Sequence, residues 1–326
     1  MSLPLHIGMD IGGSKTEAVA LDDTGAIVAS TRLPSAQGPA GVLRTAEQVV
    51  EDLARRTDRG VDEFVSVGVG IPGQVDRDRG EVRGAYNLGI DLLPLRERLR
   101  ERTGLPVGIE NDVTAAAVGA AHLMGLSGTV AYLNLGTGLA AGYVVDGRPL
   151  RGAHGVAGEI GHLPVDPLAR PCPCGQLGCL ETVASGSALR SSWPAGGAHP
   201  GHTLLAAVDS GDEEARAAFD HLVRGAAASV RLLVLALDPD TVVIGGGLRL
   251  LGPRLFDGLR ATLDRWSTDS PFLARLELSP RVQVLPEDSS AAAVGAALAV
   301  AGDDPAGAFG ASSGVGRSAK RPACRA

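Results

Sequence analysis

One histidine and three cysteines lie in a single short segment of the chain, at a spacing that suits a metal ion. His162, Cys172, Cys174 and Cys179 follow the pattern H-x9-C-x-C-x4-C in a protein that has only 4 cysteines. Three thiolates and one imidazole are the ligand set of a closed, tetrahedral zinc site. Buried free thiols and a disulfide are the alternatives, although Cys172 and Cys174 would close a very small ring. We therefore predict a structural Zn²⁺ bound by these four side chains.

Two carboxylates flank these ligands in sequence. Glu159 precedes His162 by three residues, and Glu181 follows Cys179 by two. One metal ion would therefore hold both carboxylates in a common neighbourhood. Carboxylates, an amide and an imidazole suit a polyhydroxylated ligand, because each sugar hydroxyl both donates and accepts a hydrogen bond.

An amide and a further carboxylate stand next to each other at Asn111 and Asp112, where a short strand pattern ends and an Ala-rich helical pattern begins. Such a pair is suited to sugar binding, and a carboxylate near a phosphate cleft can accept the proton of an attacking hydroxyl. An N-cap of the following helix is an equally good interpretation of these two residues.

Three glycine-rich loops, each after an apolar strand pattern, predict a nucleotide site. Successive glycines let backbone N–H groups approach phosphate oxygens, and an aspartate in the first loop could hold a hydrated Mg²⁺. The first loop opens a strand and not a helix, so it is neither a Rossmann fingerprint nor a P-loop. Each loop taken alone is also consistent with a simple tight turn. The predicted nucleotide-binding residues are Asp10, Gly12, Gly13, Ser14, Lys15, Thr16, Gly136, Thr137, Gly138, Gly245, Gly246 and Gly247.

The elements that must position these residues alternate between strands and helices, which indicates an α/β sheet protein. The pattern of strand, glycine loop, strand and turn over residues 5–31 returns over residues 129–150. Aligning Gly12 with Gly136 aligns strand with strand and turn with turn, so we predict two related sheet domains that face each other across a cleft.

Composition excludes several classes of protein. The formal net charge of −7 argues against nucleic acid as a partner, because binding to a duplex needs a basic face. No secretory signal is visible, and the longest apolar stretch, 291–301, is too short to span a membrane, so we expect a cytoplasmic protein without a membrane partner. The segment 302–326 is rich in Gly, Ala, Ser and Pro and is expected to be disordered.

Taken together, the motifs resemble those of the ROK family, which comprises repressors, open reading frames and sugar kinases. The resemblance covers about residues 5–301, with its motifs in the family's order. The segments that carry it are DIGGSKT at 10–16, GIPGQVD at 70–76, END at 110–112, LGTG at 135–138, GEIGH at 158–162, CPCGQLGCLE at 172–181 and VIGGG at 243–247.

The resemblance implies a duplicated RNase H-like fold of the actin/hexokinase type, with an ATP cleft between two domains. The expected domains are 1–118, completed by a C-terminal helix around 289–301, and 119–288, which carries the zinc loop. Asp112 matches the family's catalytic aspartate, which acts as a general base on a primary hydroxyl. The implied sugar-binding residues are Gly73, Asn111, Asp112, Glu159, His162 and Glu181.

The expected activity is ATP-dependent phosphorylation of the 6-hydroxyl of a hexose, with glucose ahead of N-acetylmannosamine, N-acetylglucosamine and fructose. A homodimer or homotetramer is expected from the resemblance alone. Two further hypotheses stay open: a sugar-responsive regulator on the same scaffold, and a catalytically silent sugar-binding protein. The regulator is disfavoured, because the first strand begins near Leu5 and the net charge is negative.

Overall fold

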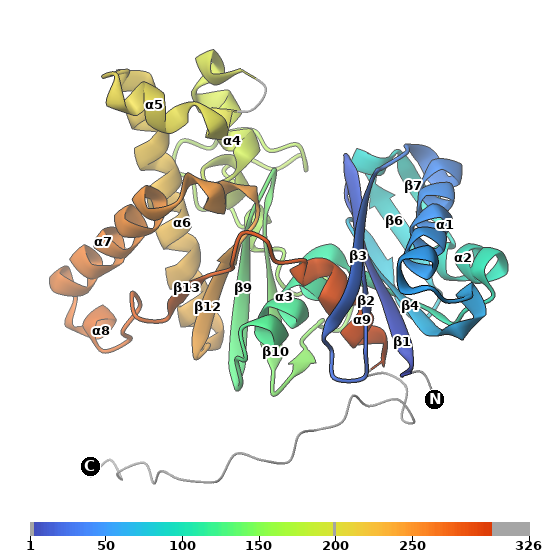
Figure 1. Ribbon diagram of the computed structural model, residues 1–326. Helices are drawn as coiled ribbons and strands as arrows, with labels where there is room; N and C mark the ends of the chain where they lie inside the picture. Colours follow the sequence, from blue (N-terminus) through green and yellow to red (C-terminus); the bar gives the residue numbers. More distant parts are fainter. Residues whose placement is uncertain (1–2, 198–199, 302–326) are drawn as a thin grey trace, which may run out of the picture.

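The computed structural model describes residues 3–197 and 200–301, which form two lobes, each built on a five-stranded sheet (Figure 1). The predicted tail over 302–326 lies outside the described residues. Within the described part of the chain, every helix is too short or too polar to cross a lipid bilayer.

The first lobe contains the N-terminal sheet, with strand order β3-β2-β1-β4-β8. Strands β1, β2 and β3 are antiparallel neighbours, whereas β1, β4 and β8 run parallel. Helices α1 and α2 pack on this sheet, and a small antiparallel sheet, β5-β6-β7, extends from it. The elements are β1 Leu5–Ile11, β2 Lys15–Leu21, β3 Ile27–Pro34, α1 Gly38–Thr57, β4 Phe64–Ile71, β5 Gln74–Asp76, β6 Glu81–Ala85, β7 Ile90–Leu93, α2 Leu95–Thr103 and β8 Val107–Asn111.

The second lobe is built on the sheet β11-β10-β9-β12-β13 and carries most of the remaining helices. Its elements are β9 Thr129–Leu135, β10 Leu139–Val145, β11 Arg148–Pro149, α4 Gly186–Ser192, α5 Leu204–Asp209, α6 Glu213–Leu237, β12 Thr241–Gly245, α7 Pro253–Asp269, α8 Pro271–Ala274 and β13 Val282–Val284. Strands β9, β10 and β11 are antiparallel neighbours, and β9, β12 and β13 run parallel. The order and directions of the strands therefore repeat those of the first sheet, which confirms the predicted duplication.

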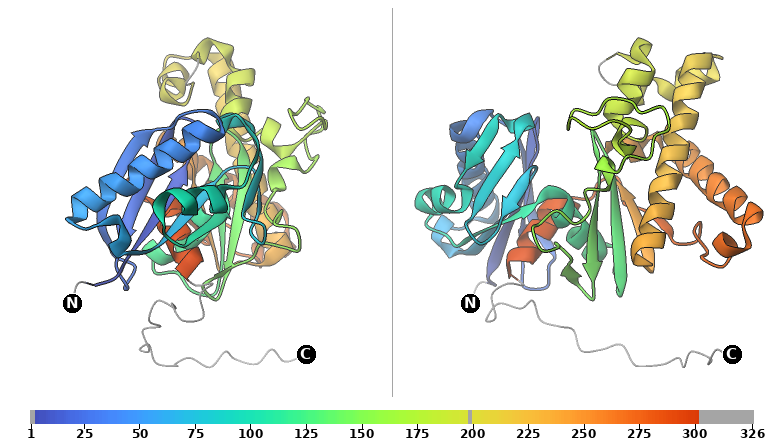
Figure 2. Two further views of the ribbon diagram at one scale, coloured as in Figure 1. Left: turned by 90° about the vertical axis from the view of Figure 1, so that its right-hand side faces the viewer. Right: turned by 180° about the vertical axis from the view of Figure 1, so that it is seen from behind.

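Two small-residue helices lie between the sheets: α3, Asp112–Leu123, and α9, Ala291–Ala301 (Figures 1 and 2). They pack so closely that a Cβ added to Gly119 would come within 1.8 Å of the Ala291 carbonyl oxygen, and one added to Gly295 within 1.7 Å of the Ala115 carbonyl oxygen. Helix α9 also packs on β1 and β4 of the first sheet. The expected boundary between 118 and 119 falls inside α3, and the division into those two domains stays a prediction.

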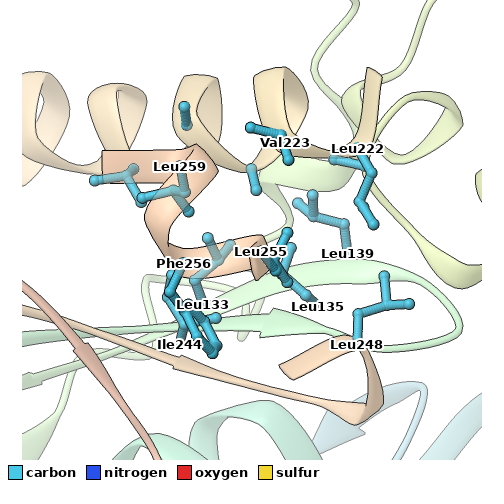
Figure 3. Close-up of a cluster of buried hydrophobic side chains, with 14 of the residues drawn as sticks. Leu133, Leu135, Leu139, Leu222, Val223, Ile244, Leu248, Leu255, Phe256 and Leu259 are labelled. Carbon is cyan, nitrogen blue, oxygen red and sulfur yellow. The ribbon is translucent and has the colours of Figure 1, made fainter. Parts of the chain in front are cut away.

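The core of the second lobe lies between its sheet and helices α6 and α7 (Figure 3). Leu133 and Leu135 are two residues apart in β9 and lie on the same face of the sheet, where they pack with Leu255 of α7 and Leu222 of α6. All four side chains are almost completely buried. The period of two in the strand and the three- and four-residue steps in the helices place these residues on the facing surfaces.

The sequence patterns did not predict two parts of the fold. The small β5-β6-β7 sheet follows the motif at 70–76, and the short helices α4 and α5 follow the zinc segment. These elements are only 3 to 7 residues long, so the hydrophobic periodicity extends over too few residues to identify them.

Candidate active site and metal centre

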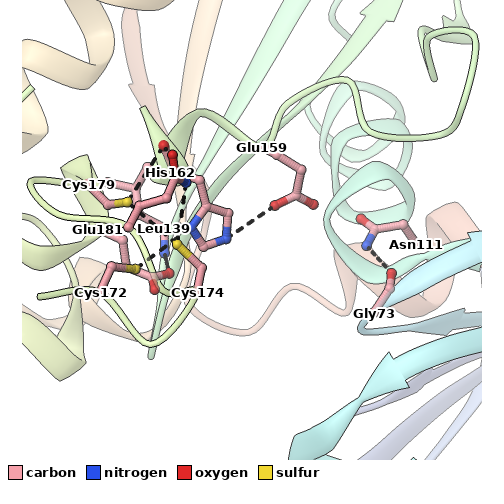
Figure 4. A network of polar contacts seen from close by, with 10 residues as sticks. Gly73, Asn111, Leu139, Glu159, His162, Cys172, Cys174, Cys179 and Glu181 are labelled. Atoms are coloured by element: carbon pink, nitrogen blue, oxygen red, sulfur yellow. Dashed lines mark hydrogen bonds and ion pairs between the residues drawn. The ribbon is translucent and has the colours of Figure 1, made fainter. Parts of the chain in front are cut away.

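The four predicted zinc ligands meet at one point in the structure. The ligand atoms of His162, Cys172, Cys174 and Cys179 all lie within 4.8 Å of one another (Figure 4). The Sγ atoms of Cys174 and Cys179 are 3.7 Å apart, and Cys172 Sγ is 3.9 Å from His162 Nδ1. Tetrahedral coordination with Zn–S bonds of about 2.3 Å requires ligand separations near ~3.8 Å. The donor set and its spacing therefore fit a zinc ion.

A compact loop brings the cysteines together. Cys172 N donates to the Gln176 carbonyl at 2.9 Å, and the chain turns at Gly175 and Gly178, both with positive φ. Hydrogen bonds from the Gln176 backbone and side chain lower the pKa of the Cys174 thiol to about 6. Burial raises the pKa of the Cys172 and Cys179 thiols, so a metal that binds all three thiolates would displace protons from this group.

The same loop carries the groups predicted to hold a sugar. His162 turns Nδ1 toward the cysteines, and its Nε2 lies 3.9 Å from Glu159 Oε2 (Figure 4). One oxygen of Glu181 accepts a hydrogen bond from Leu139 N at 3.0 Å. The side chain of Glu159 is 50% exposed. Imidazole and carboxylate groups therefore lie together on the wall of the second lobe, beside the cluster of cysteines.

Asn111 and Gly73 face this wall from the first lobe (Figure 4). Asn111 Oδ1 accepts from the backbone N–H groups of Val113 and Thr114 at 3.0 and 3.1 Å, so the N-cap interpretation is correct for Asn111. Its Nδ2 donates to the Gly73 carbonyl at 3.4 Å. Among the described residues, no hydrogen bond or ion pair joins Gly73, Asn111 or Asp112 to the group of Glu159, His162 and Glu181. The predicted sugar-binding residues thus form two half-sites on opposite lobes.

Asp112 is the first residue of α3 and is partly buried. Its Oδ1 accepts from Val113 N at 3.0 Å. Burial raises the pKa of Asp112 to about 6; the Val113 N–H acts in the opposite direction, and the charge of Glu159 adds to the rise. A carboxylate with such a pKa is ionised at neutral pH and is still basic enough to accept a proton.

A cleft of about 710 Å³ opens beside Asp112 and is also lined by Asp10. Burial raises the pKa of Asp10 to about 7; the charges of Asp112 and Glu17 add to that rise, and Lys15 opposes it. A divalent cation would favour the ionised form of both carboxylates. Two oxygen donors in one polar cleft therefore fit a Mg²⁺ ion carried by phosphates.

Only some of the predicted nucleotide-binding residues line this cleft. Asp10, Lys15, Gly246 and Gly247 do so. The residues that do not are Gly12, Gly13, Ser14, Thr16, Gly136, Thr137, Gly138 and Gly245.

Contacts of the second and third loops show how several of those residues are held in place. The Gly136 and Thr137 carbonyls accept hydrogen bonds from Gly186 N and Ser187 N at 2.8 and 3.0 Å, so this loop is bound to the start of α4. Gly245 lies under the Tyr132 hydroxyl, which an added Cβ would approach to 2.0 Å.

Lys15 forms an ion pair that the sequence did not indicate. Its Nζ lies 3.2 Å from Glu17 Oε2, which also accepts from Arg32 at 2.9 Å. Glu17 Oε1 accepts from the Ser290 hydroxyl at 2.7 Å. Although burial acts to raise it, the pKa of Glu17 is lowered overall by the Ser290 hydrogen bond and the Lys15 ammonium. Glu17 therefore holds the only lysine among the described residues at the mouth of the cleft.

Comparison with known proteins places this site in a family. The sequence description of the ROK family matches residues 6–302. The chain belongs to the ROK family. It is 34% identical to a glucokinase of Streptomyces coelicolor over 80% of its own length and 88% of that protein. It is 33% identical to an N-acetyl-D-glucosamine kinase of Citrobacter koseri, over 75% of its length and 84% of that protein.

Solved ROK structures share the fold. A ROK hexokinase from Thermus thermophilus aligns with a TM-score of 0.76 and 30% identity, over 90% of this chain and 97% of that one. A ROK family glucokinase from Streptomyces griseus, solved in complex with glucose and AMPPNP, aligns with a TM-score of 0.73 and 32% identity, over 90% and 98% of the chains. The predicted family and the two-lobed hexokinase-type fold are thereby confirmed.

Several residues of this ROK cleft escaped the sequence analysis: Glu17, Tyr132, Asn134 and Arg249. Tyr132 and Asn134 are two apart on β9 and precede the loop at 136–138, so a polar pair on one face of an apolar strand was the available signal. Arg249 donates to the carbonyls of Gly246 at 3.0 Å and of Glu287 at 2.7 Å. Nothing local in the sequence indicates that second contact.

Proposed function

We propose that this protein transfers the γ-phosphoryl group of Mg·ATP to the 6-hydroxyl of a hexose, with glucose as the expected substrate. The observation that carries the proposal is the position of Asp112, which lines the 710 Å³ cleft with Asp10 and adjoins Asn111 in the sugar half-site. A base at this boundary can reach an acceptor hydroxyl on one side and a donor phosphate on the other. The relatives named glucokinase support the same activity.

Asp112 accepts the proton of the sugar hydroxyl in the proposed reaction. The hydroxyl oxygen then forms a bond to the γ-phosphorus, and the bond between that phosphorus and the β–γ bridging oxygen breaks, which releases ADP and a hexose 6-phosphate. Asp10 would hold Mg²⁺, which neutralises charge on the phosphates. Lys15, Gly246 and Gly247 are the proposed contacts of the nucleotide.

Gly73, Asn111, Glu159, His162 and Glu181 are the proposed sugar contacts. His162 Nε2 is the nitrogen turned away from the cysteines, so the ring can hold a sugar hydroxyl while Nδ1 binds metal. The free oxygen of Glu181 and the exposed carboxylate of Glu159 supply acceptors. We propose that Zn²⁺ is structural, because four protein donors leave no open position for water.

The test is a coupled ADP-release assay across glucose, N-acetylglucosamine, N-acetylmannosamine and fructose, with and without Mg²⁺. We expect turnover that requires Mg²⁺ and is fastest with glucose. A higher kcat/KM for N-acetylglucosamine than for glucose would support the kinase activity but change the proposed substrate. N-acetylglucosamine is the second candidate because a relative from Citrobacter koseri is named N-acetyl-D-glucosamine kinase. Absence of turnover with every sugar would reject the kinase in favour of a silent binder or regulator.

A further inference from the structure

The buried carboxylate of Glu110 lies next in sequence to Asn111 and Asp112 and takes no part in the proposed phosphoryl transfer. Glu110 is the penultimate residue of β8, is 3% exposed and precedes Asn111 and Asp112. Its Oε1 accepts from Asn111 N at 3.1 Å, and its Oε2 accepts from Arg151 Nε at 2.7 Å. Arg77 Nε lies 3.7 Å from the same oxygen.

Arg151 belongs to the opposite lobe. It follows β11 and begins the loop that ends at Glu159 and His162. The loop closes on itself, because Ala157 N donates to the Arg151 carbonyl at 3.2 Å. It is then fixed to β10 where Ala141 N donates to the Gly158 carbonyl at 2.8 Å.

Gly158 shows how closely the end of this loop is held. It has φ of +101°, and a Cβ added there would lie 1.9 Å from the Ala141 carbonyl oxygen. Glu159 comes next in the chain. A shift of Arg151 is therefore expected to move the backbone at Glu159 as well.

A cavity lies between parts of the two lobes beside this ion pair. The cavity has a volume of about 570 Å³ and is lined by Glu110 and Asn111 of the first lobe, Thr114 of α3, and Arg151, His154 and Gly155 of the second lobe, among others. The Glu110–Arg151 ion pair joins the two lobes at the wall of this cavity. A buried ion pair adds little net stability when compared with apolar packing, so its value lies in fixing one relative arrangement of its two partners.

We infer that Glu110 and Arg151 are positioning residues that set the separation of the two sugar half-sites. Glu110 fixes the backbone at Asn111, and Arg151 fixes the base of the loop that carries Glu159 and His162. Together they limit how far the two half-sites can move apart, so that one hexose ring can bridge them as it binds. The inference rests on the proposed function, because the hexose is what the two halves share.

The test is a double-mutant cycle with Glu110→Gln, Arg151→Met and the double variant, in the full-length protein with its bound metal. Each single variant is expected to lower kcat/KM for the sugar at least tenfold while KM for ATP stays within twofold. The double variant should have a kcat/KM for the sugar no lower than that of the less active single variant, because each change removes the same ion pair. Arg151→Lys keeps the charge beside Glu110 and should recover part of the lost kcat/KM.

The matched control is Glu47→Gln with Arg102→Met. That pair has a similar separation of 2.8 Å but joins α1 to α2 within the first lobe, so sugar kinetics should not change. A lower thermal midpoint with unchanged KM and kcat for the sugar in Glu110→Gln would reduce the pair to a structural role and overturn the inference. Additive losses in the double variant would overturn it as well.

Failure of the proposed function gives a different result. If the wild type phosphorylates no sugar, the kinase proposal is lost, and the same cycle is then run on glucose binding by calorimetry. A tenfold weaker Kd in the single variants, without further loss in the double, supports the positioning role independently of catalysis. Unchanged Kd values overturn it.

Discussion

Two opposite influences set the pKa of the Asp112 carboxyl. As the first residue of α3 it accepts a hydrogen bond from Val113 N, which favours its charged form. Burial and Glu159 favour the neutral form, and the pKa settles at about 6. The proposed base is therefore ionised at pH 7 and can still accept a proton.

Asp112→Asn should abolish phosphoryl transfer while sugar affinity falls by less than about tenfold, because the amide keeps the shape and loses the base. Turnover and glucose binding by calorimetry measure the two effects separately. In the wild type, kcat/KM should fall as pH drops through about 6, where Asp112 becomes protonated. A variant with undiminished turnover would remove Asp112 from the mechanism.

Asp10→Asn should stabilise the ligand-free protein at pH 8 while it removes activity. The folded-state pKa of Asp10 is raised to about 7, so ionising this group opposes folding at high pH and not at low pH. The variant's thermal midpoint should exceed that of the wild type by a few degrees at pH 8, since 1 kcal/mol shifts the midpoint by about 1–2 °C in a chain of 326 residues. The difference should vanish near pH 4, where the wild-type carboxyl is also neutral; a gain that persists there would contradict the explanation.

The loop over 159–181 has little regular secondary structure, and its conformation depends on contacts between residues far apart within the loop. Its longest regular elements are short 3₁₀ turns at Ile160–His162 and Leu180–Thr182. Bridges between Pro164 and Cys179 and between Pro171 and Leu177 hold the hairpin. A bound metal would be the main constraint that fixes Glu159 and Glu181 in one wall.

Cys174→Ala should lose both the metal and most sugar affinity, because the loop that carries two proposed sugar contacts loses its anchor. Elemental analysis should find less than stoichiometric zinc, and calorimetry should show glucose affinity at least tenfold weaker. Leu168→Ala is the matched control: it lies in the same loop, is 67% exposed and has no ligand atom. Tight sugar binding by metal-free Cys174→Ala would show that sugar binding does not depend on the metal site.

In the whole molecule, the proposed sugar site is divided between the two lobes. Gly73 and Asn111 come from the first lobe, and Glu159, His162 and Glu181 from the second (Figure 4). Helices α3 and α9 lie between the sheets and connect them. A ligand that touches both half-sites therefore binds best to the arrangement in which the lobes are closest.

Glucose should lower the radius of gyration in solution scattering and should tighten binding of a non-hydrolysable ATP analogue several-fold. Both effects follow because closing the lobes assembles the sugar half-sites and narrows the donor cleft together. The reciprocal experiment should show the analogue tightening glucose binding by the same factor. Equal affinities with and without the partner ligand would contradict coupled closure.

The sequence by itself determined the cluster of His162 and three cysteines, the helix start at Asn111 and the duplicated strand pattern. These features are local: the four ligands fall within residues 162–179, and an N-cap involves only the next three residues. Contacts of this kind are set by chain stiffness and turn chemistry, so spacing is enough to find them.

Only the tertiary structure decided which residues share the clefts. Asp10 and Asp112 line one cleft although a hundred residues separate them, Ser290 reaches Glu17, and Arg151 reaches Glu110. The carbonyls of Gly136 and Thr137 accept hydrogen bonds from the start of α4, a contact that the glycine pattern of this loop does not indicate. These outcomes depend on how two sheets and the helices between them pack. That packing is set by burial summed over the whole chain, which no single motif contains.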